Sequence, residues 1–150
     1  MLLSEEIKLV MARSVLCWMA SCSPDLEPNV SPKEIFTHYG DDQILIANIA
    51  SPGTLRNLKK NPKVSLSFID IFVQKGFQIK GVAAIIEKGD PRFEELAQPL
   101  IKLTGGLFPF GSIFKIEAKS SKQILAPRYI LFPETTEADQ IERAKTQYGL

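Results

Sequence analysis

The stretch that most constrains the fold is an apolar run, Ile44–Ile49, followed at once by turn and helix-start residues. A short apolar run of this kind, bounded by turn residues, predicts a strand that is buried on both faces. Ser51 and Pro52 then provide an N-cap and a first helical position, and Asn61-Pro62 ends the helix. The sequence therefore predicts a buried strand that turns sharply into a short helix.

The predicted helix is unusual because it contains no acidic residue. Helices commonly carry Asp or Glu in the first turn, but every charged residue from Ser51 to Lys63 is basic. Free backbone amides, the hydroxyls of Ser51 and Thr54, and the guanidinium of Arg56 would suit a phosphate group. An alternative stays open, in which Ser51 only caps the helix and the lysines of its last turn complement the helix dipole.

Composition limits the classes of function. A chain of 150 residues with 45% hydrophobic residues can form one core, so one domain spanning residues 1–150 is expected. A net charge of +1 argues against binding to nucleic acid or to an anionic membrane. The apolar run 15–20 is too short to span a bilayer and follows acidic residues, so a cytoplasmic location is expected.

Cysteine and histidine are too sparse for common metal sites. Cys17 and Cys22 lie five positions apart on a predicted strand, face opposite sides, and are not expected to pair. His38 is the only histidine, so no zinc site is predicted. No nucleophile or acid is tied to His38 by a motif, and no catalytic residue is assigned.

Alternating apolar and polar residues predict further strands and peripheral helices. With Ile44–Ile49 the count is about six strands in mostly antiparallel order, which predicts a small barrel. The other predicted strands are 15–21, 27–36 continued by 36–39, 63–68, 77–86 and 112–118, with a short addition at 123–125. Helices are predicted near the amino terminus and at 92–103 and 137–148. The apolar loop Leu107–Gly111 is interpreted as a lid, a subunit contact or a buried crossing.

One stretch carries polar side chains on a single face. In extended geometry Asn29, Ser31 and Lys33 point to one side and Val30 to the other. These side chains would line a groove, or they belong to an irregular solvated edge strand, because two prolines interrupt the stretch.

Three segments resemble a known family in their order and spacing. They are Ser51–Leu58 (SPGTLRNL), Asn61–Leu66 (NPKVSL) and Gly76–Gly81 (GFQIKG). They resemble the flavin-binding split-barrel family typified by pyridoxamine 5'-phosphate oxidase, over roughly Val15 to Ala118. The resemblance implies a mainly β fold, a six-stranded antiparallel split β-barrel with peripheral helices. It also implies a homodimer that holds FMN in a groove between its subunits.

The resemblance further implies which residues bind the cofactor. The flavin ring would lie beside Asn29, Val30, Ser31 and the strand end Ala47, Asn48, Ile49 and Ala50. The phosphate would lie near Ser51, Thr54, Arg56 and Asn57, with Lys33. Lys75 and Gln78 would make further contacts to the ring or the ribityl chain.

The function implied is that of an FMN-dependent oxidoreductase that takes electrons from a reduced substrate or a nicotinamide donor. A non-catalytic carrier of flavin or haem is the alternative, with His38 as the single candidate haem ligand. Two departures from the family matter. Thr54 stands where many relatives have Lys or Arg, and after Ala118 there is no His and only Arg128 and Arg143. The second departure argues against oxidation of pyridoxamine phosphate itself.

Overall fold

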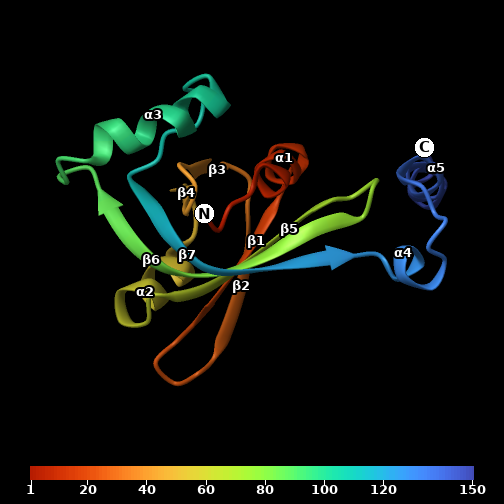
Figure 1. Cartoon of the computed structure of the whole chain (residues 1–150). Helices are drawn as coiled ribbons and strands as arrows, with labels where there is room; N and C mark the ends of the chain where they lie inside the picture. The colour runs from red at the N-terminus through yellow and green to blue at the C-terminus, as the bar shows by residue number, and fades with distance from the viewer.

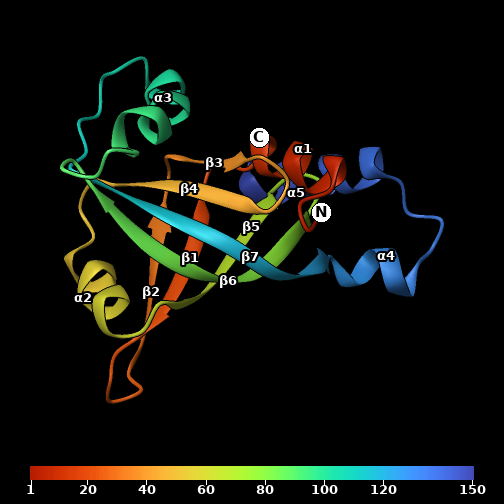
Figure 2. The same cartoon turned by 60° about the vertical axis from the view of Figure 1, so that its left-hand side comes forward.

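The protein, described over residues 1–150 by a computed structural model, is a curled antiparallel sheet with helices around it (Figures 1 and 2). In chain order the elements are α1 (Glu5–Arg13), β1 (Cys17–Cys22), β2 (Pro28–Lys33), β3 (Phe36–Tyr39), β4 (Gln43–Asn48), α2 (Pro52–Lys60), β5 (Lys63–Asp70), β6 (Lys75–Glu87), α3 (Phe93–Thr104), β7 (Ser112–Leu125), α4 (Pro127–Leu131) and α5 (Glu137–Tyr148).

The seven strands form one sheet in the order β2-β1-β5-β6-β7-β4-β3, and every neighbouring pair is antiparallel. The edge strands β2 and β3 are consecutive in the chain and are separated only by Glu34 and Ile35. Because the chain passes from one sheet edge to the other within two residues, the sheet must curl (Figure 2). The predicted mainly β split-barrel class is confirmed.

The predicted count of six strands was wrong. The stretch read as one continued strand bends at Glu34-Ile35, where the Ile35 carbonyl accepts a hydrogen bond from the Ala47 amide at 3.0 Å. This bond fixes the bend and divides the stretch into β2 and β3. The two segments read as 112–118 and 123–125 are instead one strand, β7, which pairs along the whole of β6. A bulge between Lys80 and Gly81 accommodates their unequal lengths.

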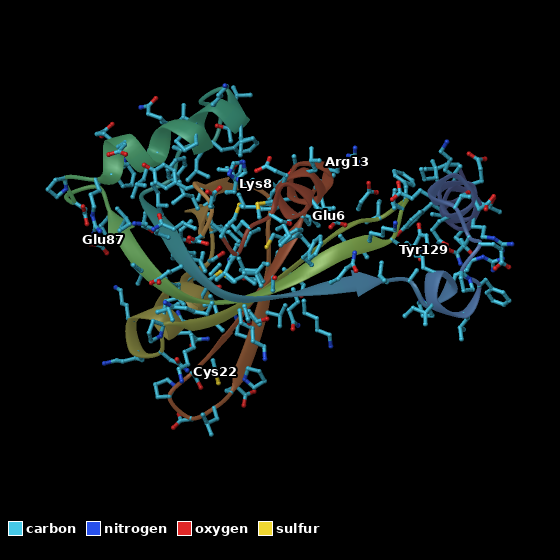
Figure 3. The ribbon with its side chains drawn as sticks, in the orientation of Figure 1. Glu6, Lys8, Arg13, Cys22, Glu87 and Tyr129 are labelled. Carbon is cyan, nitrogen blue, oxygen red and sulfur yellow. The ribbon has the colours of Figure 1, made fainter.

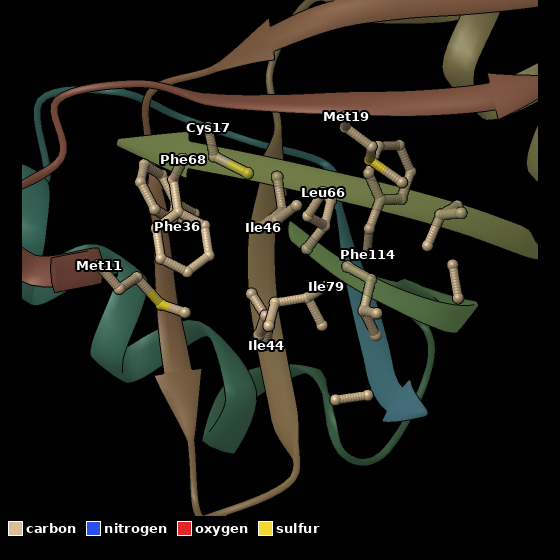
Figure 4. Packing of buried hydrophobic residues seen from close by; sticks show 14 of the residues in the cluster. Met11, Cys17, Met19, Phe36, Ile44, Ile46, Leu66, Phe68, Ile79 and Phe114 are labelled. Carbon is tan, nitrogen blue, oxygen red and sulfur yellow. The ribbon is translucent and has the colours of Figure 1, made fainter. Parts of the chain in front are cut away.

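Strand β4 is buried on both faces, as predicted. Ile44 and Ile46 face the main core, which α1 also enters, whereas Leu45 and Ala47 pack beneath α3. Figure 4 shows the main core, in which Ile44 and Ile46 lie beside side chains of the sheet and of α1. The end of β4 is therefore rigidly held where the chain turns into α2.

Most of the remaining helices and strands lie where the sequence predicts them. Ser4 caps α1 by accepting from the Ile7 amide, and Thr136 caps α5 in a reciprocal pair of bonds with Asp139. Pro127 follows the end of β7 and begins the short helix α4. Both cysteines are free. None of the helices combines the length and apolar character that a membrane crossing requires.

Candidate functional site

Lys33 lies at the centre of a polar corner between β2 and the start of α2. Its side chain is buried, with 4% exposure, and its Nζ donates to Ser31 Oγ at 2.8 Å and to Ser51 Oγ at 2.5 Å. A longer contact of 3.4 Å reaches Thr54 Oγ1. We call Ser31, Lys33, Ser51 and Thr54 the anion corner. It gathers one ammonium and three hydroxyls from segments about twenty residues apart.

The anion corner has no negative charge of its own. No carboxylate forms an ion pair with Lys33. The titratable group beside it is the thiol of Cys17, its partner on β1, and burial raises the pKa of that thiol to about 12, so it stays neutral. Burial also lowers the pKa of Lys33 to about 8. A buried ammonium without a counter-charge is costly, and an anion placed here would remove that cost.

The start of α2 faces the same corner with free donors. Ser51 makes no side-chain cap bond, because its hydroxyl accepts from Lys33 instead. The backbone amides of Gly53 and Thr54 have no acceptor within the chain. The capping part of the alternative is therefore wrong, whereas Lys59 and Lys60 do lie in the last turn of α2, as it predicted. The acid-free helix start keeps its positive end available to an anion.

Gly53 lies between two further predicted residues. A Cβ added at Gly53 would lie 3.9 Å from Asn29 Oδ1 and 3.9 Å from Arg56 Nη2, with nothing nearer. The backbone at the helix start is thus open, and an amide and a guanidinium flank it. Asn29, Ser31 and Lys33 share the less exposed face of β2, as their spacing predicts, and β2 is an edge strand of the sheet.

A pocket of about 250 Å³ adjoins the anion corner at the end of β4. Its wall contains five of the predicted residues, which are Lys33, Ala47, Ile49, Ala50 and Ser51. Phe108, from the apolar loop 107–111, also lines it and was not predicted as a site residue. Leu107 and Phe108 are 79% and 51% exposed, so this loop is not a buried crossing. The only sequence signal for Phe108 was an aromatic residue in a glycine-flanked loop.

Three predicted residues lie near the corner without facing it. The Asn57 amide donates to Ser21 Oγ at 3.0 Å and so ties α2 to β1. The Asn48 amide donates to Ser112 Oγ at 2.9 Å, and its buried Oδ1 has no donor. Val30 is 58% exposed on the opposite face of β2. The pairing of Asn48 with Ser112 was not foreseen, because Ser112 follows it by more than sixty residues.

Lys75 and Gln78 are not brought to the anion corner of the same chain. Lys75 opens β6 at the end of the sheet that carries α4 and α5, where its Nζ lies 2.9 Å from Glu137 Oε1 and 4.8 Å from the centre of the Tyr129 ring. Tyr129 is labelled at this end in Figure 3, away from α2. Gln78 pairs with Ser67, which pairs in turn with the half-exposed Trp18.

Comparison with known proteins places this geometry in a family. The family model for pyridoxamine 5'-phosphate oxidase matches residues 3–129. No curated protein matches the chain in sequence.

Solved structures share the fold at low sequence identity. HupZ of Group A Streptococcus is 19% identical over 82% of this chain and 94% of its own, with a TM-score of 0.71. An FMN-binding protein of Syntrophomonas wolfei is 17% identical over 83% and 87%, with a TM-score of 0.69. HutZ, the haem storage protein of Vibrio cholerae, is 21% identical over 83% and 95%, with a TM-score of 0.63. Because the family model spans most of the chain and the fold agrees, this protein belongs to the pyridoxamine 5'-phosphate oxidase family.

Proposed function

We propose that this protein binds FMN, with the phosphate at the anion corner. The observation that carries the proposal is Lys33, a buried ammonium that contacts three hydroxyls and no acid. The backbone amides of Gly53 and Thr54 add two free donors at the start of α2. Phosphate satisfies such a set, because its oxygens accept several charge-assisted bonds at once.

The flavin ring would lie along the end of β4. Ala47, Ile49, Ala50 and Phe108 supply an apolar wall next to the anion corner. Bound flavin would supply the electron chemistry, and the residues of this chain would position it and exclude water.

A second copy of the chain would complete the site. Small-molecule sites commonly enclose roughly 300–1,000 Å³, and the pocket within one chain, about 250 Å³, is below that range. Trp18 and Val30 are 48% and 58% exposed on the outer face of β1 and β2, as expected of a homodimer contact. In such a dimer, Lys75 and Gln78 of the second copy are the candidates for further contacts to the ring.

The family and the proposed cofactor together suggest an oxidoreductase. The donor would be a reduced small molecule or a reduced nicotinamide, and electrons would pass to a second substrate or to oxygen. No side chain near the anion corner is required as an acid or a base, because hydride transfer to a flavin needs position more than proton transfer. A non-catalytic flavin carrier would share the same site.

An absorption spectrum of the purified protein tests FMN binding. We expect a flavin spectrum that dithionite bleaches and air restores, and a loss of bound flavin in Lys33→Met. Lys102→Gln, on the exposed side of α3, is the matched control and should retain flavin. Purification without colour, together with no uptake of added FMN, would contradict the proposal. Bleaching by reduced nicotinamides would distinguish an enzyme from a carrier.

The second candidate function is that of a haem carrier, and the position of His38 favours it. His38, the only imidazole, lines a pocket of about 480 Å³ between α1, β3 and the end of α3, which shares Phe108 with the pocket beside the anion corner. HutZ, a structural neighbour, is a haem storage protein. Titration with haem should then give a Soret band that His38→Ala removes and Lys33→Met leaves unchanged. The opposite pattern would exclude His38 as the ligand.

A further inference from the structure

A second polar cleft lies at the far end of the sheet, between α4, α5 and the turn that joins β5 to β6. It encloses about 980 Å³. Most of its wall lies beyond residue 129, outside the part of the chain that the family model matches. Figure 1 shows α4 and α5 at the end of the sheet away from α2. The cleft is therefore distinct from the anion corner.

The buried amide of Gln140 leaves one polar atom without a partner. Gln140 is 5% exposed, and its Nε2 donates to Gln74 Oε1 at 2.8 Å. Its Oε1 is buried and has no donor. Buried amide oxygens are nearly always hydrogen-bonded, so this atom calls for a donor from a bound molecule.

Arg128 supplies the complementary unpaired group. Its Nε is buried without an acceptor, and its guanidinium lies 5.1 Å from the centre of the Phe132 ring. Neither Arg128 nor Arg143, which also lines the cleft, forms an ion pair. Hydrogen bonds with Thr136 hold the pKa of Asp139 below its usual range, and the charges of the two guanidiniums lower it slightly further. A guanidinium with free donors in a fork matches a carboxylate.

The charged residues that line the cleft indicate what net charge a bound molecule should carry. Two arginines face three acids, Glu134, Asp139 and Glu142. Glu142 already pairs with Lys145 at 3.5 Å, so two arginines and two acids remain and the cleft favours no net charge. A zwitterion matches both kinds of charge in the cleft. Its carboxylate can accept from Arg128, and its ammonium can donate to Gln140 Oε1 and to the acidic side chains.

We propose that this cleft binds a free α-amino acid. The carboxylate accepts from the guanidinium of Arg128, and the ammonium donates to Gln140 Oε1. The site does not depend on the proposed cofactor, so each proposal can fail without the other.

Thermal shift with each of the twenty standard amino acids, added singly to the full-length protein, is the first test. At least one should raise the melting temperature. Calorimetric titration should then show that its analogues lacking the amino or the carboxyl group bind at least tenfold more weakly. For alanine these analogues are propionate and ethylamine.

Variants assign the binding to the two residues. Arg128→Lys and Gln140→Leu should each weaken binding at least tenfold. Gln140→Glu keeps an acceptor oxygen and should still bind, and Lys102→Gln should match the unmodified protein. If no amino acid raises the melting temperature, if the half-ligands bind equally well, or if Gln140→Leu folds and binds normally, the proposal is overturned. A change of oligomeric state in Arg128→Lys would instead assign the cleft to contact with a second copy.

Discussion

Two lysines from the same predicted cofactor set lie in opposite surroundings. Lys33 is 4% exposed, forms side-chain hydrogen bonds only with hydroxyls, and has a pKa lowered to about 8 by burial. Lys75 lies half-buried at the other end of the sheet, and the hydrogen bond with Glu137 raises its pKa. Lys75 has its counter-charge within the chain, and Lys33 does not. Lys33 is therefore the lysine of this pair for which a bound anion would supply the missing counter-charge.

A pair of glycines, one in each region, gives the largest contrast. A Cβ at Gly76, next to Lys75, would lie 2.1 Å from the backbone carbonyl oxygen of Phe68. Gly76→Ala should therefore lower the free energy of unfolding by about 3 kcal/mol. Gly53→Ala meets nothing closer than 3.9 Å and should change it by less than about 0.5 kcal/mol. Urea denaturation of both variants measures this difference.

The same Gly53→Ala variant tests where the phosphate lies. Its methyl group enters the space between Asn29 and Arg56, so FMN affinity should fall about tenfold although stability is unchanged. Quenching of flavin fluorescence on binding measures the affinity. Full affinity in Gly53→Ala would mean that the phosphate does not approach the start of α2.

Much of this architecture could be predicted because it follows from local patterns. The two-sided burial of β4 follows from its apolar run, and the start of α2 from Ser51-Pro52. The division between β2 and β3 could not be predicted, because a hydrogen bond to Ala47, more than ten residues away, fixes the bend. Strand count depends on such long-range pairing, whereas strand existence depends on local sequence.

The candidate site likewise has features that the local sequence predicted and features that depend on long-range contacts. The alternation along β2 predicted that Ser31 and Lys33 share a face, and the lack of acids predicted an open helix start. That Ser51 would turn from its cap position towards Lys33 was not predictable, because it requires the two segments to be in contact. Phe108 reaches the pocket only through the packing of the loop after α3, which no local pattern describes.

Substitution of the two lysines compares their roles directly. Lys33→Met should weaken FMN binding about ten- to a hundredfold, since a bond to a charged group contributes roughly 1.5–3 kcal/mol. The same change should stabilise the cofactor-free protein by about 1–2 kcal/mol, because it removes a buried unpaired charge. Lys75→Met should reduce FMN affinity only a few-fold. Thermal unfolding without FMN and calorimetric titration with FMN measure the two effects.

An opposite result for either lysine would be informative. Loss of stability in Lys33→Met would mean that the hydroxyl contacts outweigh the cost of burial, so that the missing counter-charge does not destabilise the folded protein. A loss of affinity in Lys75→Met as large as in Lys33→Met would place Lys75 of a second copy directly on the cofactor.

The contributions of Lys33 and Lys75 to folding stability should change with pH in opposite directions. The pKa of Lys33, about 8 in the folded protein, lies below its unfolded value of 10.5, so the unfolded chain binds more protons between these values. The stability of the cofactor-free protein should thus gain from Lys33 as pH rises from 8 to 10.5. Affinity for FMN should fall over the same range, by up to about tenfold per pH unit, because the ammonium is lost. Calorimetric titrations at pH 7, 8 and 9 measure this loss, and Lys33→Met should remove the pH dependence.

The smallest effect is expected from the ion pair at the other end of the sheet. The pKa of Lys75 is raised in the folded protein, so its contribution to stability is complete below the unfolded value and is lost as pH rises through the folded one. Glu137→Gln removes the pair, whose side chains are 29% and 53% exposed, and should cost no more than about 1 kcal/mol. The loss should shrink in high salt, because exposed pairs are screened. Thermal unfolding at low and high salt measures it, and a cost that is larger and independent of salt would show that Glu137 anchors α5 to the sheet by more than charge.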